Sequence, residues 1–177
     1  GDDTECGGVS MTNAAMRRSQ LEALVEAQGG CRATPPLLLP AGPYFDLAGE
    51  EFGRRLLLTT DASGEEYCLR PDFTLPIATD YIANGERHPA AFSYLGPIFR
   101  QRAGKPAEFD QAGIELLAQP DGEVALDQVF TFARAALSIY GIVPQVLLGG
   151  VGLFEALLAQ ADMPDAWRSR IRPRFGP

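Results

Sequence analysis

The sequence is poor in the residues that mark several classes of protein. Its one histidine is His88, and its three cysteines, Cys6, Cys31 and Cys68, include no Cys-x-x-Cys pair. This scarcity excludes a recognisable zinc or iron–sulfur motif, so no metal site is expected. An odd number of widely spaced cysteines instead indicates buried or half-buried, reduced thiols in a cytoplasmic protein.

Long apolar runs and an excess of positive charge are also missing. The longest apolar runs, such as Leu37–Leu39, are far shorter than the roughly 18 to 20 residues of a membrane helix. Fifteen lysines and arginines against 23 aspartates and glutamates give a formal net charge of −8. A surface of this charge works against binding to a polyphosphate backbone. We therefore expect neither a membrane nor a nucleic-acid partner.

Motifs for common cofactors and catalytic devices are absent as well. The glycines within 149–152 do not form G-x-G-x-x-G, and Gly104-Lys105 is followed by proline, which excludes a P-loop. His88 precedes Pro89 and has no nucleophile nearby in sequence, which favours a surface histidine over a general base. The sequence therefore predicts no cofactor and no catalytic residue.

The composition that remains is typical of one folded domain. Hydrophobic residues make up 46% of the chain and charged residues 21%, as in soluble globular domains. A length of 177 residues suits a single domain. Residues 1–10 are acidic and glycine-rich and lack the features of a secretory signal, so we interpret them as a leader or as residues added in cloning. The domain is then expected over 11–177.

Periodicity and turn residues predict the order of helices and strands. The expected helices are 14–28, 74–84, 121–140 and 153–160, and the expected strands are 37–39, 56–60, 66–69, 93–102, 108–117 and 145–148. Residues 149–152 are expected to form a turn, and 167–177, with arginine at every second position from 168 to 174, a solvated end. Hairpins interleaved with helices favour an α+β domain around a mainly antiparallel sheet.

The strand expected at 108–117 carries the most informative pattern. Alternation places Phe109, Gln111, Gly113 and Glu115 on one face. Because glycine has no side chain, Gly113 leaves room between the glutamine and the glutamate for a ligand to lie on the sheet. The alternative is an ordinary polar outer face of a half-exposed sheet.

Two further residues are expected beside this face. A four-residue loop at 103–106 pairs Arg100 near Phe109, on the side of Gln111. Asp72 lies between a predicted strand and a predicted helix, where side chains project into clefts, although a helix cap also explains it. Such a set suits a zwitterionic amino acid, with Arg100 and Gln111 for its carboxylate, Asp72 for its ammonium group and Glu115 for a side-chain donor.

Three ordered motifs carry a resemblance to a known family. They are Leu-Arg-Pro-Asp-Phe-Thr at 69–74, Tyr-Leu-Gly-Pro-Ile-Phe-Arg at 94–100 and Glu-Phe-Asp-Gln-Ala-Gly-Ile-Glu at 108–115. The chain resembles the core of histidyl-tRNA synthetase and, more closely, the paralogous regulatory subunits of ATP phosphoribosyltransferase, from about Met16 to Trp167. The resemblance implies a class II aminoacyl-tRNA synthetase-like fold, an antiparallel sheet flanked by helices, and a homodimer.

The resemblance also assigns roles to residues. The synthetase motif Phe-Arg-x-Glu, whose glutamate holds adenine, reads Phe99-Arg100-Gln101-Arg102 here. In contrast, the positions that match the synthetase's histidine pocket stay polar: Asp72 stands in place of its glutamate, and Thr74, Gln111 and Glu115 are retained. Arg100 matches the motif arginine that approaches the substrate carboxylate. A preserved histidine site beside a damaged ATP site implies a subunit that senses histidine without activating it.

The resemblance leaves three functions open. The family's later histidine-recognition loop and the synthetase's motif 3 have no match, so the domain is expected to be incomplete at its C-terminal end. The leading hypothesis is a non-catalytic regulatory subunit that binds L-histidine as feedback effector and activates a short-form ATP phosphoribosyltransferase catalytic subunit. The alternatives are a histidyl-tRNA synthetase or fragment of one, which forms histidyl-adenylate and charges tRNA, and a free-standing amino-acid-binding protein.

Overall fold

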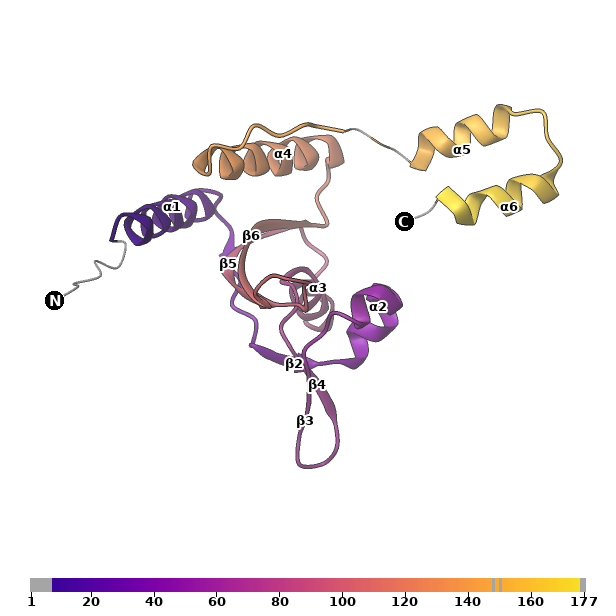
Figure 1. Cartoon of the computed structure of the whole chain (residues 1–177). Coiled ribbons are helices and arrows are strands. Elements are labelled where there is room, and N and C mark those ends of the chain that lie inside the picture. Colours follow the sequence, from indigo (N-terminus) through magenta and orange to yellow (C-terminus); the bar gives the residue numbers. More distant parts are fainter. Residues whose placement is uncertain (1–7, 148, 150, 176–177) are drawn as a thin grey trace. The chain divides into compact units, whose positions relative to one another are not determined.

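The computed structural model describes residues 8–147, 149 and 151–175, which fall into two compact units divided after Val143. The helices of the first unit are α1 (Gly8–Glu26), α2 (Gly42–Gly53), α3 (Thr74–Ala83) and α4 (Gly122–Ile139). Its strands are β1 (Cys31–Arg32), β2 (Leu38–Pro40), β3 (Leu58–Thr60), β4 (Glu66–Leu69), β5 (Ala90–Phe99) and β6 (Glu108–Leu117). The second unit contains α5 (Val151–Gln160) and α6 (Asp165–Phe175) (Figure 1).

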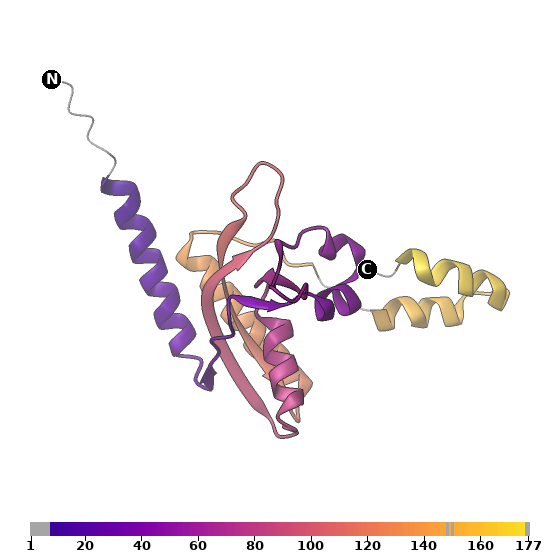
Figure 2. The ribbon, with the colours of Figure 1, turned by 90° about the horizontal axis from the view of Figure 1, so that it is seen from below.

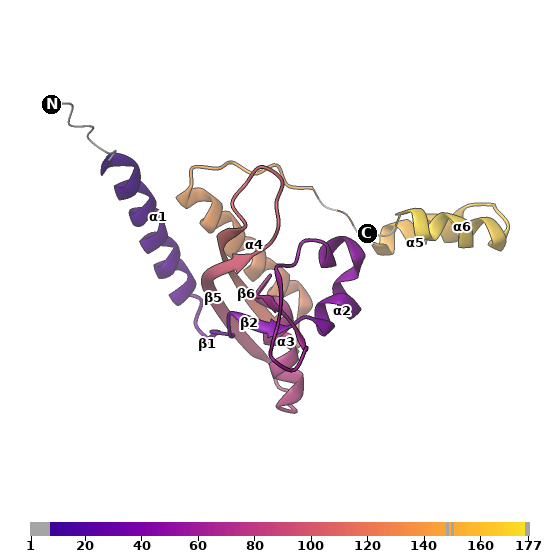
Figure 3. The same ribbon diagram turned by 60° about the horizontal axis from the view of Figure 1, so that its bottom comes forward.

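The strands of the first unit form two three-stranded sheets. One has the order β1-β5-β6, with β5 and β6 antiparallel and the short β1 parallel to β5. The other has the order β2-β4-β3 and is antiparallel throughout, and it lies beside α2 (Figure 3). The predicted α+β class and the mainly antiparallel pairing are therefore confirmed.

Helices cover both faces of the long β5–β6 hairpin (Figures 1 and 2). On one face α1 and α4 bury a core made of Leu21, Val25, Leu95, Ile114 and Phe132. On the other face α3 and the residue before it bury a second core made of Phe73, Ile77, Tyr94 and Ile98. Because strand side chains alternate, Ile114 enters the first core while its neighbours Gly113 and Glu115 face the second. The face singled out in the sequence is thus the one beneath α3.

The register of the hairpin differs from the prediction. Phe99 pairs with Glu108, and the Arg100 amide donates to the Ala107 carbonyl at 2.9 Å, so Arg100 lies opposite Ala107 rather than Phe109. The loop therefore spans 101–106, with Gly104 at a φ of +67° that suits its tight turn. Because the shift is two residues, the pairing still places Arg100 on the side of Gln111.

Several local predictions are confirmed. The hairpin of β3 and β4, helix α3 and helix α4 lie close to the expected ranges. Asp121 caps α4, because its carboxylate accepts from the amides of Glu123 and Val124 at 2.9 and 3.1 Å. His88 is exposed, as expected.

Other local predictions are wrong. No strand forms at 144–147, and Leu148 is outside the described residues. Helix α2 was not predicted, because the sequence around it is rich in proline. Pro43 lies in the first turn of α2, where a missing backbone donor costs nothing. Cys68 is buried, as expected, but Cys31 is exposed, so the expectation that the thiols are buried or half-buried is wrong for Cys31. Cys6 is outside the described residues.

The second unit also departs from the prediction. Helix α5 begins at Val151, within the expected turn, and the expected solvated end is helix α6 up to Phe175. The arginines lie on a helix although they occupy every second position. Arg168 pairs with Asp165, one turn earlier in α6, at 2.7 Å, and Arg172 pairs with Glu155 of α5 at 2.8 Å. Over the described residues, no helix combines the length and apolar character needed to cross a membrane.

Candidate functional site

Arg70 anchors the segment that carries two of the predicted site residues. Its side chain is 5% exposed, and its guanidinium donates to the carbonyl of Pro97 at 2.8 Å and to that of Pro35. The guanidinium carbon lies 4.1 Å from the centre of the Phe73 ring. These contacts tie the start of α3 to β5, so that Asp72 and Thr74 lie beside the β5–β6 hairpin.

Asp72 is half-buried at the N-terminus of α3. Its carboxylate accepts a hydrogen bond of 3.1 Å from the Leu75 amide, so Asp72 satisfies an amide of the first turn from one residue before the N-cap position, Phe73. Burial raises the pKa of Asp72, while the Leu75 bond and the positive charge of Arg100 act in the opposite direction. The second carboxylate oxygen, Oδ2, has no hydrogen-bond partner among the described residues and can accept from a ligand.

Thr74 and Glu115 meet across α3 and β6. The Thr74 hydroxyl donates to Oε1 of Glu115 at 2.6 Å, and the Tyr94 hydroxyl donates to the same oxygen at 3.2 Å. Burial and the nearby Glu115 charge raise the pKa of Tyr94, which keeps its hydroxyl protonated as a donor. In the described part of the chain Oε2 of Glu115 has no partner, so the carboxylate is oriented by two hydroxyls and keeps one oxygen for a ligand.

Tyr94 fills the space above Gly113 that was expected to hold a ligand. Gly113 lies directly opposite Tyr94 in the hairpin, and a Cβ on Gly113 would lie 2.3 Å from the Tyr94 hydroxyl oxygen. The Tyr94 ring also stacks on Phe73, with centroids 4.5 Å apart and planes 5° from parallel. The expectation that Gly113 leaves room for a ligand is therefore corrected: it leaves room for Tyr94. Sequence reasoning missed Tyr94, although the hairpin register points to it.

Gln111 and Arg100 lie toward the other end of this face. Oε1 of Gln111 is buried and has no hydrogen-bond partner among the described residues. The Arg100 Nε donates to the Pro71 carbonyl at 2.6 Å, and its guanidinium lies 5.1 Å from the centre of the Phe52 ring. The structure thus places Arg100 beside the Asp72 segment, with an unsatisfied amide acceptor on the neighbouring strand.

Tyr44 is a further polar group that sequence reasoning did not find. It is 2% exposed, and its hydroxyl has no partner among the described residues. Burial raises its pKa, and the negative charge of Asp72 raises it further. Tyr44 therefore belongs to the polar surroundings of Asp72, and the only sequence signal was a tyrosine in a proline-rich stretch.

Arg102 covers an aromatic face at the end of the hairpin. Its guanidinium carbon lies 3.6 Å from the centre of the Phe109 ring, and Nε and Nη2 donate to the Pro106 carbonyl at 3.0 and 2.6 Å. This position carries the glutamate in the synthetase motif, whereas a guanidinium only donates hydrogen bonds. No group of three or more metal-binding side chains converges in the described ranges.

This fold and this arrangement of motifs define the class II synthetase-like proteins. The family model for histidyl-tRNA synthetase matches residues 9–174, and the chain belongs to that family. It resembles a solved "ATP phosphoribosyltransferase regulatory subunit/histidyl-tRNA synthetase" from Bacillus halodurans, with a TM-score of 0.73 and 25% identity over 92% of this chain and 43% of that one.

Curated relatives narrow the resemblance to one kind of protein within that family. ATP phosphoribosyltransferase regulatory subunits from Mesorhizobium japonicum and Sinorhizobium medicae are 43% and 39% identical to the chain, over 79% and 85% of its length. The chain covers 38% and 41% of these two relatives, so it spans about two fifths of their length. The predicted resemblance to these regulatory subunits is confirmed.

Proposed function

We propose that this chain is the histidine-binding core of a non-catalytic regulatory subunit of ATP phosphoribosyltransferase. The observation that carries the proposal is the Glu115 carboxylate, which two hydroxyls hold through Oε1 while Oε2 stays available. The names of the curated relatives support the regulatory role in histidine biosynthesis.

Each of the five proposed residues would bind a different polar group of L-histidine. Glu115 and Thr74 would hold the imidazole, because a fixed carboxylate oxygen accepts from a ring N–H. Asp72 would pair with the ammonium group, and Arg100 with the carboxylate. The unsatisfied Oε1 of Gln111 would accept a ligand donor, while its amide NH₂ can donate to the carboxylate. Tyr94 would act as a positioning residue through Glu115.

The ATP side of the site is unsuited to adenylate formation. Arg102 lies against Phe109 and bonds to Pro106, so a cation stands where the synthetase motif places an acceptor for adenine. The alternative function, histidyl-adenylate formation followed by tRNA charging, therefore lacks a key group. The net charge of −8 also opposes tRNA binding.

Regulation requires a partner in which the chemistry occurs. We infer that the complete protein forms a homodimer through this core and activates a short-form ATP phosphoribosyltransferase catalytic subunit, and that histidine reverses the activation. Any effect of histidine on this assembly requires the partner to change histidine affinity by the same factor. Titrating histidine with and without the catalytic subunit measures this coupling, and failure of the complete protein to associate would favour a free-standing amino-acid-binding protein.

Calorimetric titration with L-histidine tests the binding site. Glu115→Gln should weaken binding by about 1 to 3 kcal/mol, because it replaces a charged acceptor. Glu108→Gln is the matched control, since Glu108 is an exposed glutamate on the same strand. Equal histidine affinity in the two variants would remove Glu115 from the site.

A further inference from the structure

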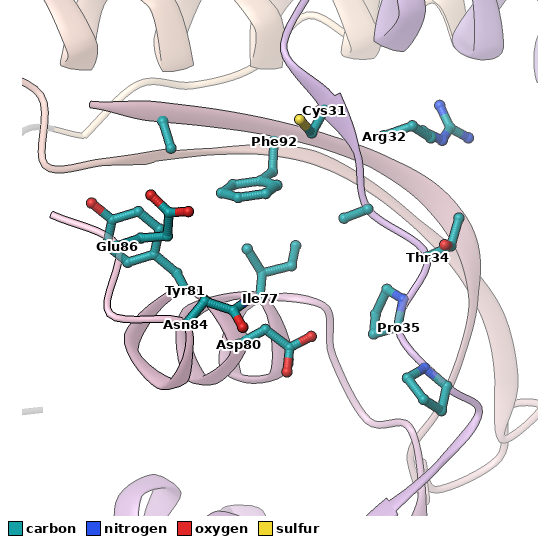
Figure 4. A pocket seen from close by; sticks show the side chains of 13 residues that line it. Cys31, Arg32, Thr34, Pro35, Ile77, Asp80, Tyr81, Asn84, Glu86 and Phe92 are labelled. Atoms are coloured by element: carbon teal, nitrogen blue, oxygen red, sulfur yellow. The ribbon is translucent and has the colours of Figure 1, made fainter. Parts of the chain in front are cut away.

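A pocket of about 500 Å³ lies between α3 and the segment that begins at β1 (Figure 4). It is bounded by β1, the chain from Ala33 to Pro36, α3, the turn after α3 and the start of β5 (Figure 4). None of the five proposed histidine-binding residues lines it. Its volume is within the range of about 300 to 1,000 Å³ that small-molecule sites occupy.

The interior walls of the pocket are apolar and well packed. Phe92 and Ile77 face the cavity from β5 and α3, and Pro35 closes the opposite side (Figure 4). Ile77 is 5% exposed and belongs to the same core as Phe73 and Tyr94. A ligand body in this pocket would therefore contact a preformed surface of one aromatic ring and aliphatic groups.

Two carboxylates give the pocket its charge. Asp80 on α3 and Glu86 in the following turn both line it, and neither forms an ion pair among the described residues. The turn is held in place, because the Tyr81 hydroxyl donates to the His88 carbonyl at 2.7 Å and the Glu86 amide donates to the Tyr81 carbonyl at 3.2 Å. The negative charge is thus carried on an ordered segment.

The one basic residue of the lining does not neutralise this charge. Nη2 of Arg32 donates to the Leu95 carbonyl at 3.3 Å, and its guanidinium points away from the cavity (Figure 4). The Asn84 side chain also lines the pocket and adds neutral hydrogen-bonding groups. The pocket therefore combines apolar walls with uncompensated negative charge.

We propose that this pocket is a second ligand site and that it binds a small organic cation with an apolar or aromatic body. An ammonium group placed near Asp80 or Glu86 gains charge complementarity, and an aromatic body packs against Phe92. An anionic ligand of the same shape is repelled by the two carboxylates. The pocket and the proposed histidine site share no residue, although Phe92 lies opposite Glu115 in the β5–β6 hairpin.

The test uses 2-phenylethylamine as the probe and the whole 177-residue chain. Two-dimensional NMR should show saturable shifts at the Ile77 methyl groups and the Asn84 side-chain amide. The uncharged 2-phenylethanol and the anionic phenylacetate are ligand controls and should bind at least fivefold more weakly. Binding of the alcohol as tight as that of the amine, or shifts confined to other residues, would overturn the proposal.

Neutral variants then test the carboxylates. Asp80→Asn and Glu86→Gln should each weaken the amine by about 2- to 5-fold, in line with exposed charge pairs, and the double variant by about 10-fold. Asp127→Asn, an exposed aspartate on α4 outside the pocket, should leave the affinity unchanged. An unchanged affinity in the double variant contradicts the proposal. A second copy of the chain covering the pocket would also contradict the proposal. Its sign would be NMR line broadening at the pocket residues that grows with protein concentration and persists when the amine is added.

Discussion

Thr74 donates a hydrogen bond of 2.6 Å to Glu115, although the two residues are 41 positions apart in the sequence. The bond joins the first residue of α3 to the C-terminal part of β6, so it depends on the docking of α3 against the hairpin. Tyr94 donates to the same oxygen from the neighbouring strand. The orientation of the Glu115 carboxylate therefore depends on three separate segments of the chain: α3, β5 and β6.

Replacing Gly113 by alanine should destabilise the hairpin. The new Cβ would lie 2.3 Å from the Tyr94 hydroxyl oxygen and 2.4 Å from its Cζ, so the ring must move off Phe73. Overpacking of this kind costs about 1 to 3 kcal/mol, which thermal or urea unfolding detects. Gly122→Ala is the control, because nothing lies within 4 Å of a Cβ at the first turn of α4. Equal stability of the two variants would mean that Tyr94 can shift without cost.

Arg70→Lys should destabilise the first unit despite the retained charge. Lysine cannot reach the Pro35 and Pro97 carbonyls together, and it loses the flat contact with Phe73. A lost hydrogen bond from a charged group costs about 1.5 to 3 kcal/mol. The midpoint of urea unfolding should fall, whereas Arg134→Lys on the exposed side of α4 should leave it in place. A common midpoint for both variants would contradict an anchoring role for Arg70.

Asp72→Asn should stabilise the fold at neutral pH and lose this advantage in acid. Because burial raises the pKa of Asp72, the folded state binds the proton more tightly than the unfolded state. The ionised group therefore destabilises the fold above its folded pKa, and this penalty fades as the pH falls to the ordinary aspartate pKa of about 3.9. Asparagine keeps an acceptor for the Leu75 amide.

Unfolding of wild type and Asp72→Asn across pH 3 to 7 measures the difference. Under the proposed function, histidine binding should also weaken in this variant, since Asp72 is the proposed partner of the ammonium group. A difference in stability that stays constant with pH would show that Asp72 titrates alike in both states.

Arg102→Glu should not create adenylating activity. The substitution supplies a carboxylate at the position of the synthetase glutamate, but the motif 3 residues of the synthetase have no counterpart in this sequence. It also removes the guanidinium that lies over Phe109. Histidine-dependent pyrophosphate exchange should stay at background in wild type and variant, and a clear rise in either would support the synthetase function.

Local patterns allowed the sequence to predict much of the secondary structure and the strand face on which the candidate site residues lie. The alternation along β6 depends only on neighbouring residues, and so does the Asp121 cap of α4. The expected loop length gave the correct face of Arg100 but the wrong partner, because the loop also takes in Gln101 and Arg102. The strand expected at 145–148 does not form over its described residues 145–147, and an extended segment without a pairing partner is not stable as a strand.

Contacts between distant segments decided the rest. Tyr94 lies over Gly113 because the hairpin register makes them opposite residues, and Phe73 then covers the ring from the start of α3. Arg70 is buried because carbonyls of Pro35 and Pro97 happen to converge on it once the segments pack. The residue types of the site could be read from the chain, because they follow from local pattern and motif. Their orientation could not, since hydrogen bonds between α3, β5 and β6 exist only after the hydrophobic face of the hairpin is buried.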